Sequence, residues 1–574
     1  ELQRAAQPLG MADFLDALSR APAPAAQPRR AFYKRFCQAW LDRAYEQMPI
    51  LRRFERASYE ALVERFRTLD REQLGATRQR LRRLLAGRRP PTNSVAPPSS
   101  ELAILRRELQ KQRRHKPIRQ LFHEIPQLLG QIKPCLLMSP LSISQFLDPE
   151  LPPFDLVIFD EASQIRTEDA IGAIMRGRAL IVVGDNRQLP PTSFFSTDDT
   201  PDEDDETASE EIFESILDAA SAAGLPTRLL RWHYRSRDEA LITFSNRQFY
   251  SARLATFPNA YSAPGRGIHL EHVPDGVYDR QGSRSNPVEA RRVADLVIAH
   301  WRATPEQSLG VVTFSQAQQL AVLHALERSR AADETLAPLF DENRPEPFFV
   351  KNLENVQGDE RDAMIISVGY GRDAAGRVLM NFGPLNQLGG ERRLNVAITR
   401  ARDRVTVVSS LLPEDIDVRR VQNPGPRLLR EYLDYARNGG PGGPAQATNG
   451  VTPQHVSARP LAQSLDPRFE DRLAVALARR GLQLARQIGH SDFRIDIAVR
   501  DPHNPQQFVL GIECDGDDYR TAATARDRER LREQVLSTLG WHIHRAWSAA
   551  WARDPEAEIE RAAAALAMAT DVSK

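Results

Sequence analysis

Two adjacent carboxylates, Asp160 and Glu161, directly follow the mostly apolar run FDLVIF. In open α/β sheets ligands bind at the carboxyl ends of the strands, so chemistry is expected at this position. One carboxylate could hold Mg²⁺, and the other could orient or deprotonate a water molecule. The next apolar run ends in GDNRQLPP, which places Gly184, Asp185 and Gln188 on a turn where a glutamine could sense a γ-phosphate. A helix N-cap is the alternative interpretation of the two carboxylates.

Three further carboxylates lie in short apolar runs near the C-terminus. Asp496 lies in FRIDIAV, and Glu513 and Asp515 lie in FVLGIECDG. Because side chains alternate along a strand, Asp496 is expected opposite the apolar face, and Glu513 and Asp515 are expected to share a face. That apolar face is expected to carry Ile495, Ile497 and Val499. Carboxylates on one side of adjacent strands repel each other unless a cation lies between them. The pattern therefore predicts a Mg²⁺ site of oxygen ligands, with solvated edge acids as the alternative.

The elements that must position these residues alternate between helices and buried strands. The chain has 574 residues, too many for one hydrophobic core, so several domains are expected. Residues 1–116 carry apolar residues at helical spacing among many charges, which predicts long charged helices that form an arm. The later apolar runs are typical of buried parallel strands. These runs are CLLMS, FDLVIFD, ALIVVGD, LGVVTF, DAMIISVGY and RVTVVSS.

Composition sets further limits. In residues 198–211 nine of fourteen side chains are acidic, which predicts a solvated loop, and the Gly- and Pro-rich residues 436–465 predict a linker. The block from residue 466 has the expected order α-β-β-β-α-β. No stretch approaches 18 apolar residues, so no membrane partner is expected. Three scattered cysteines without a CxxC pair argue against a structural zinc site or a disulfide scaffold and fit a reducing cytoplasm.

The central part of the chain resembles superfamily 1 helicases, in the branch of paired RecA-like, AAA-type domains that includes nonsense-decay and DNA-replication helicases. Six segments occur in the order in which that family has its motifs. They are DEAS (160–163), GDNRQLPP (184–191), HYRSR (233–237), VVTFSQAQ (311–318), VQGDERD (356–362) and LNVAITRAR (394–402), which resemble motifs II, III, IIIa, IV, V and VI.

The resemblance implies a role for each residue of the ATP site. Asp160 would hold Mg²⁺, Glu161 would be the catalytic base and Gln188 would contact the γ-phosphate or the attacking water. Tyr234 would pack on the adenine, and Glu360 would contact the nucleotide. The other nucleotide-binding positions are Gly184, Asp185 and Gly358.

Two arginines, Arg235 and Arg400, would be arginine fingers delivered from the second RecA-like domain, because phosphoryl transfer needs positive charge as negative charge develops. Surface salt bridges are the alternative for both. Three residues would touch the backbone of a nucleic-acid strand, namely Ser139, Pro140 and Thr313. The sequence alone does not distinguish whether this strand is DNA or RNA.

One departure from the family is the absence of any GxxxxGK[ST] segment in the sequence. That loop supplies the backbone cradle and the lysine for the phosphates. We expect it upstream of Glu1, which makes the first RecA-like domain incomplete and leaves this chain a poor ATP binder alone. A degenerate motor is the alternative. The expected domains are a helical arm (1–116), the end of the first RecA-like domain (117–227), the second RecA-like domain (228–435), the linker (436–465) and a C-terminal domain (466–574).

The C-terminal block resembles the PD-(D/E)XK nuclease superfamily, and in detail the very-short-patch-repair-like endonuclease domains. The resemblance rests on GHSDFRIDIAV, GIECDG and ARDRERLREQVLSTLGWHIHRAW. It implies that Asp496 and Glu513 bind a metal ion and that Glu470 is an accessory acid. Asp515 stands where the superfamily has a lysine, and Arg520 follows Tyr519 where close relatives have a histidine. Positive charge for catalysis would then have to come from metal or arginine.

These observations predict an α/β protein that acts as an ATP- and Mg²⁺-dependent DNA helicase or translocase with a fused endonuclease, in bacterial DNA repair, restriction or phage defence. The DNA would be a single-stranded track, with duplex as a further substrate for cleavage. Two alternatives stay open. One is an RNA helicase whose terminal domain only binds, and the other is a nucleic-acid-binding scaffold with a dead motor. Protein partners are not predicted.

Overall fold

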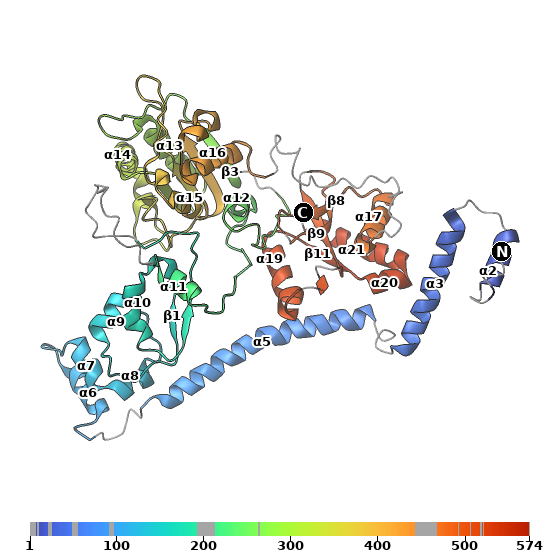
Figure 1. Ribbon diagram of the computed structural model, residues 1–574, viewed down its shortest axis with the longest axis horizontal. Helices are drawn as coiled ribbons and strands as arrows, with labels where there is room; N and C mark the ends of the chain where they lie inside the picture. The colour runs from blue at the N-terminus through green and yellow to red at the C-terminus, as the bar shows by residue number, and fades with distance from the viewer. Residues whose placement is uncertain are drawn as a thin grey trace.

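The structure is a computed structural model (Figure 1). It describes residues 7, 11–20, 26–48, 55–90, 97–191, 213–261, 265–441, 468–491, 493–505, 507–516, 519–520 and 522–572. The predicted acidic loop and most of the predicted linker lie outside these residues. None of the helices within the described part is long and apolar enough to cross a membrane.

The N-terminal part is helical, as predicted. Its helices are α2 (Ala12–Arg20), α3 (Ala26–Gln47), α5 (Arg56–Arg88) and α6 (Glu101–Gln110). Helix α5 has 33 residues and is therefore about 50 Å long. It runs from the C-terminal domain at one end toward helix α8 (Pro126–Ile132) at the other (Figure 1), and it contacts both. It is thus an arm that connects the C-terminal domain with the helices beside the small sheet described next.

A small parallel sheet follows the arm. Strand β1 (Val157–Phe159) pairs with β2 (Leu180–Val182), with Val157 opposite Leu180. The helices around it are α7 (Ile118–Glu124), α9 (Pro140–Phe146), α10 (Thr167–Ile174) and α11 (Ile216–Ala222). A buried cluster that includes Phe159 and Ala170 covers one face.

The run CLLMS, predicted to be a strand of this sheet, is not one. Residues 133–139 form no strand, and Leu137 is 96% exposed. An apolar run becomes a strand only when a neighbouring strand satisfies its backbone groups, and β1 and β2 are the only strands described in this sheet.

A larger, fully parallel sheet has five strands in the order β3-β7-β6-β4-β5. Its strands are β3 (Gly267–His272), β4 (Leu309–Thr313), β5 (Phe349–Asn352), β6 (Arg361–Ser367) and β7 (Ala401–Ser409). Helices α13 (Pro287–Ala303) and α14 (Gln316–Ala332) pack on one face. The other face is covered by α12 (Ala240–Gln248), α15 (Gly390–Ile398) and α16 (Pro424–Arg437). Burial on both faces explains the continuous apolar runs.

The C-terminal domain, residues 468–572, has its own four-stranded sheet in the order β11-β10-β9-β8. Its elements are α17 (Phe469–Arg479), β8 (Leu484–Ile488), β9 (Ile495–Arg500), β10 (Phe508–Cys514), the π-helical turn η6 (Asp527–Leu531), α19 (Arg532–Thr538) and β11 (Ile543–Ala546). The predicted α-β-β-β-α-β order is confirmed, and α20 (Ser548–Arg553) and α21 (Pro555–Val572) follow it. The α/β fold class, with a parallel-sheet RecA-like domain and a separate C-terminal sheet domain, is therefore confirmed.

The C-terminal domain packs against the chain just before β3. Phe257 and Ala260 share a buried cluster with Trp541 and Ile495. The Trp541 indole N–H donates to the Pro258 carbonyl over 2.8 Å. This apolar contact fixes the C-terminal domain to the domain of the five-stranded sheet.

Candidate functional sites

The first candidate site begins at the carboxyl end of β1. Asp160 accepts the Glu161 backbone N–H through Oδ1 over 3.0 Å. Glu161 has φ of 52° and ψ of 39°, in the left-handed region that non-glycine residues avoid. Its side chain caps no backbone N–H of the short 3₁₀ helix that follows, Ala162–Gln164, so N-capping by Glu161 does not explain the pair. Strained backbone of this kind is concentrated at functional sites.

Residues of the two parallel sheets meet at this acidic pair. The Gln357 amide donates from Nε2 to Glu161 Oε2 over 3.1 Å, and Gln357 Oε1 accepts the Leu189 N–H over 3.2 Å. Arg400 donates from Nη2 to Gln188 Oε1 over 3.3 Å. The structure therefore brings together Glu161, Gln188 and Arg400, three residues that the sequence singled out.

Asp185 anchors the loop after β2. It accepts hydrogen bonds from Gln188 Nε2 over 2.9 Å and from the Tyr250 hydroxyl over 2.7 Å. Asn395 donates to the same Tyr250 oxygen over 3.1 Å. Burial, and then the Asp185 charge, raise the pKa of Tyr250 well above its usual value, so its hydroxyl stays a donor. Asp185 thus orients Gln188. Gly184 allows the loop to pass close to residues 162 and 163, because a Cβ at this position would lie 3.0 Å from their backbone nitrogens.

Arg400 is 3% exposed and directly precedes β7. Burial, and then repulsion from Arg235, lower its pKa to about 10, so it remains charged at neutral pH. Arg235 itself forms an ion pair with Glu360 over 2.7 Å at a half-exposed position. The predicted arginine finger and nucleotide contact are therefore paired with each other here.

The remaining residues that were predicted to contact the nucleotide or the nucleic-acid backbone differ in their exposure. Tyr234 is 75% exposed, and Gly358 has φ of 87° with no atom within 4 Å of the position that a Cβ would take. Ser139 accepts the Ser142 N–H and begins helix α9, with Pro140 as the first helical residue. Thr313 is fully buried, and its hydroxyl donates to the Ser315 carbonyl over 3.0 Å. In this arrangement the Thr313 side chain is therefore not accessible to a nucleic-acid strand.

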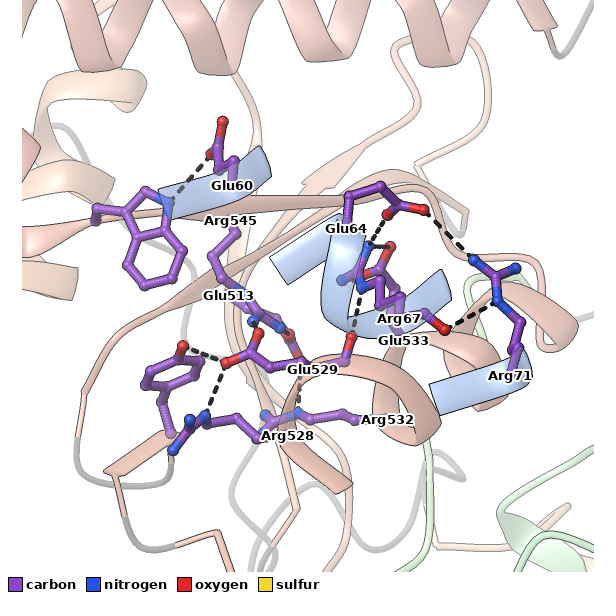
Figure 2. A network of polar contacts seen from close by, with 12 residues as sticks. Glu60, Glu64, Arg67, Arg71, Glu513, Arg528, Glu529, Arg532, Glu533 and Arg545 are labelled. Atoms are coloured by element: carbon purple, nitrogen blue, oxygen red, sulfur yellow. Dashed lines mark hydrogen bonds and ion pairs between the residues drawn. The ribbon is translucent and has the colours of Figure 1, made fainter. Parts of the chain in front are cut away.

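The second candidate site lies at the end of β10. Asp496 accepts the Cys514 N–H through Oδ2 over 2.8 Å. Burial, and secondarily the neighbouring Glu513 charge, raise the Asp496 pKa to about 7. Glu513 is buried and accepts from Arg532 Nε over 2.6 Å and from Arg545 Nη2 over 3.0 Å (Figure 2). The two arginines therefore compensate the negative charge of Glu513 in this arrangement.

The predicted three-carboxylate cation site is not assembled. Asp515 accepts the backbone N–H and the hydroxyl of Ser548 over 2.7 and 2.8 Å, at the start of α20. Glu470 lies against Gly516, where its Oε1 would be 2.5 Å from an added Cβ. Within the described ranges no three His, Cys, Asp or Glu side chains lie close enough to hold a metal ion. Arg532 and Arg545 compensate the charge of Glu513, so this arrangement does not fit Mg²⁺, but the Glu513 charge still raises the Asp496 pKa. Metal binding by Asp496 and Glu513 therefore stays a prediction.

The strand-face prediction for β9 is correct for two of its three apolar residues. Ile497 and Val499 pack in one buried cluster, whereas Ile495 packs in the cluster on the opposite face, beside Trp541. Ile495 lies near Gln487, whose φ of 52° disturbs the regular alternation of the neighbouring strand β8.

Sequence reasoning missed five residues of the two sites. Gln357 and Asn395 lie inside the segments VQGDERD and LNVAITRAR, but the sequence does not show that they come close to Glu161 and Tyr250 in space. Tyr250 gave no signal. Arg532 and Arg545 lie within the segment that resembles a nuclease, but a chain with 77 basic residues offers no means of selecting them.

Comparison with known families agrees with this division. Residues 138–196 and 208–411 match the AAA_11 and AAA_12 families, both described as AAA domain. Residues 469–566 match the REase_MTES_1575 family.

Several helicases are similar in sequence. An uncharacterized ATP-dependent helicase of Mycoplasma pneumoniae is 28% identical over 76% of this chain and 38% of its own length. Another from Mycoplasma genitalium is 33% identical over 54% of this chain and 28% of its own length. This chain thus spans well under half of either relative. The DNA polymerase alpha-associated DNA helicase A of Saccharomyces cerevisiae is 25% identical over 46% of this chain and 39% of its own length.

Among solved structures, the arterivirus nonstructural protein 10 helicase is 11% identical, with 54% of this chain and 56% of that chain covered, at a TM-score of 0.22. The motifs and the family matches together show that the chain combines AAA-type helicase domains of superfamily 1 with a C-terminal REase_MTES_1575 endonuclease-like domain.

Proposed function

We propose that this protein is part of an ATP-driven helicase or translocase that acts on DNA and carries a fused endonuclease domain. The observation that carries the motor part is the contact of Arg400 with Gln188 across the two sheets, beside Glu161. The similarity to a yeast DNA helicase supports DNA over RNA as the substrate.

The positions of the motor residues support the following proposed roles. Glu161 would orient or deprotonate the attacking water, and Gln188 would report on the γ-phosphate to Arg400. Arg400, charged and buried at the contact between the sheets, would stabilise the negative charge that develops on the phosphate. Arg235 would exchange its partner Glu360 for the nucleotide. MgATP is the substrate of this site, with Asp160 as the proposed magnesium contact.

The endonuclease part is cleavage of a phosphodiester by the C-terminal domain, in repair, restriction or phage defence in the cytoplasm. Its support is the family match and the pairing of Asp496 with Glu513 at the ends of adjacent strands. Since the described arrangement does not fit a metal ion, this activity is proposed for a state in which Glu513 is free of Arg532 and Arg545.

The test measures ATP hydrolysis and strand separation by the protein expressed from its whole reading frame, with DNA and RNA duplexes side by side. DNA-stimulated hydrolysis that is lost in the Glu161→Gln variant is expected. Equal stimulation by RNA alone would favour an RNA helicase. Absence of hydrolysis with either nucleic acid would point to a scaffold. Cleavage of plasmid DNA, compared with a Glu513→Ala control, tests the endonuclease part separately.

A further inference from the structure

Glu513 is enclosed by charge. Its side chain is 3% exposed, and those of Arg532 and Arg545 are 12% and 10% exposed. Each carboxylate oxygen accepts a charge-assisted hydrogen bond from one of these arginines. The Arg532 guanidinium also lies 3.9 Å from the centre of the Phe493 ring. A cation could reach Glu513 only if a guanidinium left.

The segment that carries Arg532 is held by the N-terminal arm, helix α5. Arg526 and Arg530 both pair with Asp70 of the arm, over 2.6 and 2.7 Å. Arg67 donates from Nε to the Glu529 carbonyl over 2.6 Å and forms an ion pair with Glu533 (Figure 2). The arm therefore contacts residues before, within and after the π-helical turn η6, which directly precedes Arg532. Such π-helical turns are rare in proteins, and those that occur often lie at functional sites.

The arm also contacts the segment that carries Arg545. Arg56 donates from Nη2 to the Arg545 carbonyl over 3.2 Å. The Tyr59 hydroxyl lies 3.3 Å from the Tyr519 hydroxyl, and Tyr519 donates to Glu529. Glu529 in turn accepts from Arg545 Nη1 over 2.6 Å. Both arginines on Glu513 are thus positioned by contacts that lead back to α5.

The contacting residues of α5 lie on one face of the helix, because residue 56 is three and four positions from residues 59 and 60, residue 67 is seven from residue 60, and residue 70 is three from residue 67. They are Arg56, Tyr59, Glu60, Arg67 and Asp70. At its other end α5 contacts α8, beside the small sheet of the motor. A movement of the small sheet would therefore be transmitted along a rigid helix to this face.

We propose that Arg67 and Asp70 are positioning residues that keep Arg532 and Arg545 on Glu513, and that withdrawal of α5 opens Glu513 to a divalent cation. The inference rests on the proposed endonuclease function of the C-terminal domain. It assigns to the arm the control of that function by the motor.

The test measures Mn²⁺ binding to the whole chain by the electron paramagnetic resonance signal of free Mn²⁺. Two double variants are compared with the wild type, Arg532→Gln/Arg545→Gln and Arg67→Ala/Asp70→Asn. Both are expected to tighten Mn²⁺ binding at least tenfold, and adding Glu513→Ala is expected to abolish each gain. Arg71→Ala and Glu72→Gln are the matched controls, because these exposed arm residues have no described contact with the C-terminal domain.

Each outcome decides the inference. No gain in the arginine double variant would show that Glu513 is not a cation ligand. Tighter Mn²⁺ binding in the arginine double variant but not in the arm double variant would show that α5 does not control access to Glu513. Cleavage assays on the same proteins separate the two proposals. Tighter Mn²⁺ binding without cleavage would overturn the endonuclease function alone, whereas wild-type cleavage unaffected by the arm variant would overturn only the inference. Thermal unfolding confirms that each variant is folded.

Discussion

Arg400 and Gln188 are 212 residues apart in the sequence, yet the Arg400 guanidinium donates to the Gln188 amide oxygen over 3.3 Å. This hydrogen bond joins the loop after β2 to the residue that directly precedes β7, so it links the two parallel sheets beside Glu161. A sensor of the γ-phosphate and a cation that can stabilise its transfer are thereby coupled directly.

Replacing Arg400 tests that coupling. In the protein expressed from its whole reading frame, Arg400→Ala is expected to lower kcat for ATP hydrolysis by about 10³-fold or more, the usual effect of losing an arginine finger. KM for ATP should change much less, because the charge acts mainly in the transition state. Arg400→Lys keeps the charge but loses the second donor, so partial activity is expected. An unchanged kcat in Arg400→Ala would contradict the assigned role.

Loss of Glu529 should destabilise the C-terminal domain strongly. Glu529→Ala leaves buried Arg545 without one of its two carboxylate partners, and breaking a buried ion pair costs about 3–5 kcal/mol. Glu556→Ala removes an exposed partner of Arg480 and is expected to cost less than about 1 kcal/mol. Denaturant unfolding followed by tryptophan fluorescence measures both. Equal effects of the two changes would show that burial of the Glu529 cluster is energetically unimportant.

Stability should also fall as pH rises through 7, because of Glu239. Burial raises the pKa of this carboxyl from 4.5 to about 7, so the protonated form is favoured in the folded state. The stabilisation is complete below about pH 4.5 and is lost as pH rises through 7, a change of about 3 kcal/mol. Glu239→Gln should flatten this part of the pH profile of thermal unfolding, whereas Glu327→Gln, on the exposed face of α14, should leave it intact. A wild-type profile in Glu239→Gln would refute the assignment.

The contact between the C-terminal domain and the domain of the five-stranded sheet depends on Trp541. Trp541→Phe keeps most of the apolar surface but removes the hydrogen bond to the Pro258 carbonyl, with an expected loss of about 1 kcal/mol. Hydrogen exchange of residues 255–261 should accelerate correspondingly. Trp301→Phe, in the separate cluster between α13 and the sheet, is the control and should leave exchange in that segment unchanged.

Much of the fold was predictable from the sequence. The runs LGVVT and IIS are buried on both faces of the five-stranded parallel sheet, which explains why they are continuously apolar. The run VIF is not buried in this way, since Ile158 is 59% exposed. The helicase motifs were also visible in the sequence. The segments that carry Asp160, Gln188 and Arg400 are weak signals one by one, but six such segments occur in the order of the family's motifs. The rule that places ligands at the carboxyl ends of strands pointed to Asp160 and Glu161, and the resemblance implied that Gln188 and Arg400 act beside them.

The environment of the endonuclease-like carboxylates was decided only by the tertiary structure. Asp70 pairs with Arg526 across 456 residues of sequence, and nothing local marks one arginine among many as its partner. The sequence showed Asp496, Glu513 and Asp515 as like charges in need of a cation, but Arg532, Arg545 and Ser548 satisfy two of them instead. Charge compensation depends on distance in space rather than on spacing along the chain, so the folded chain alone could reveal that arginines occupy Glu513.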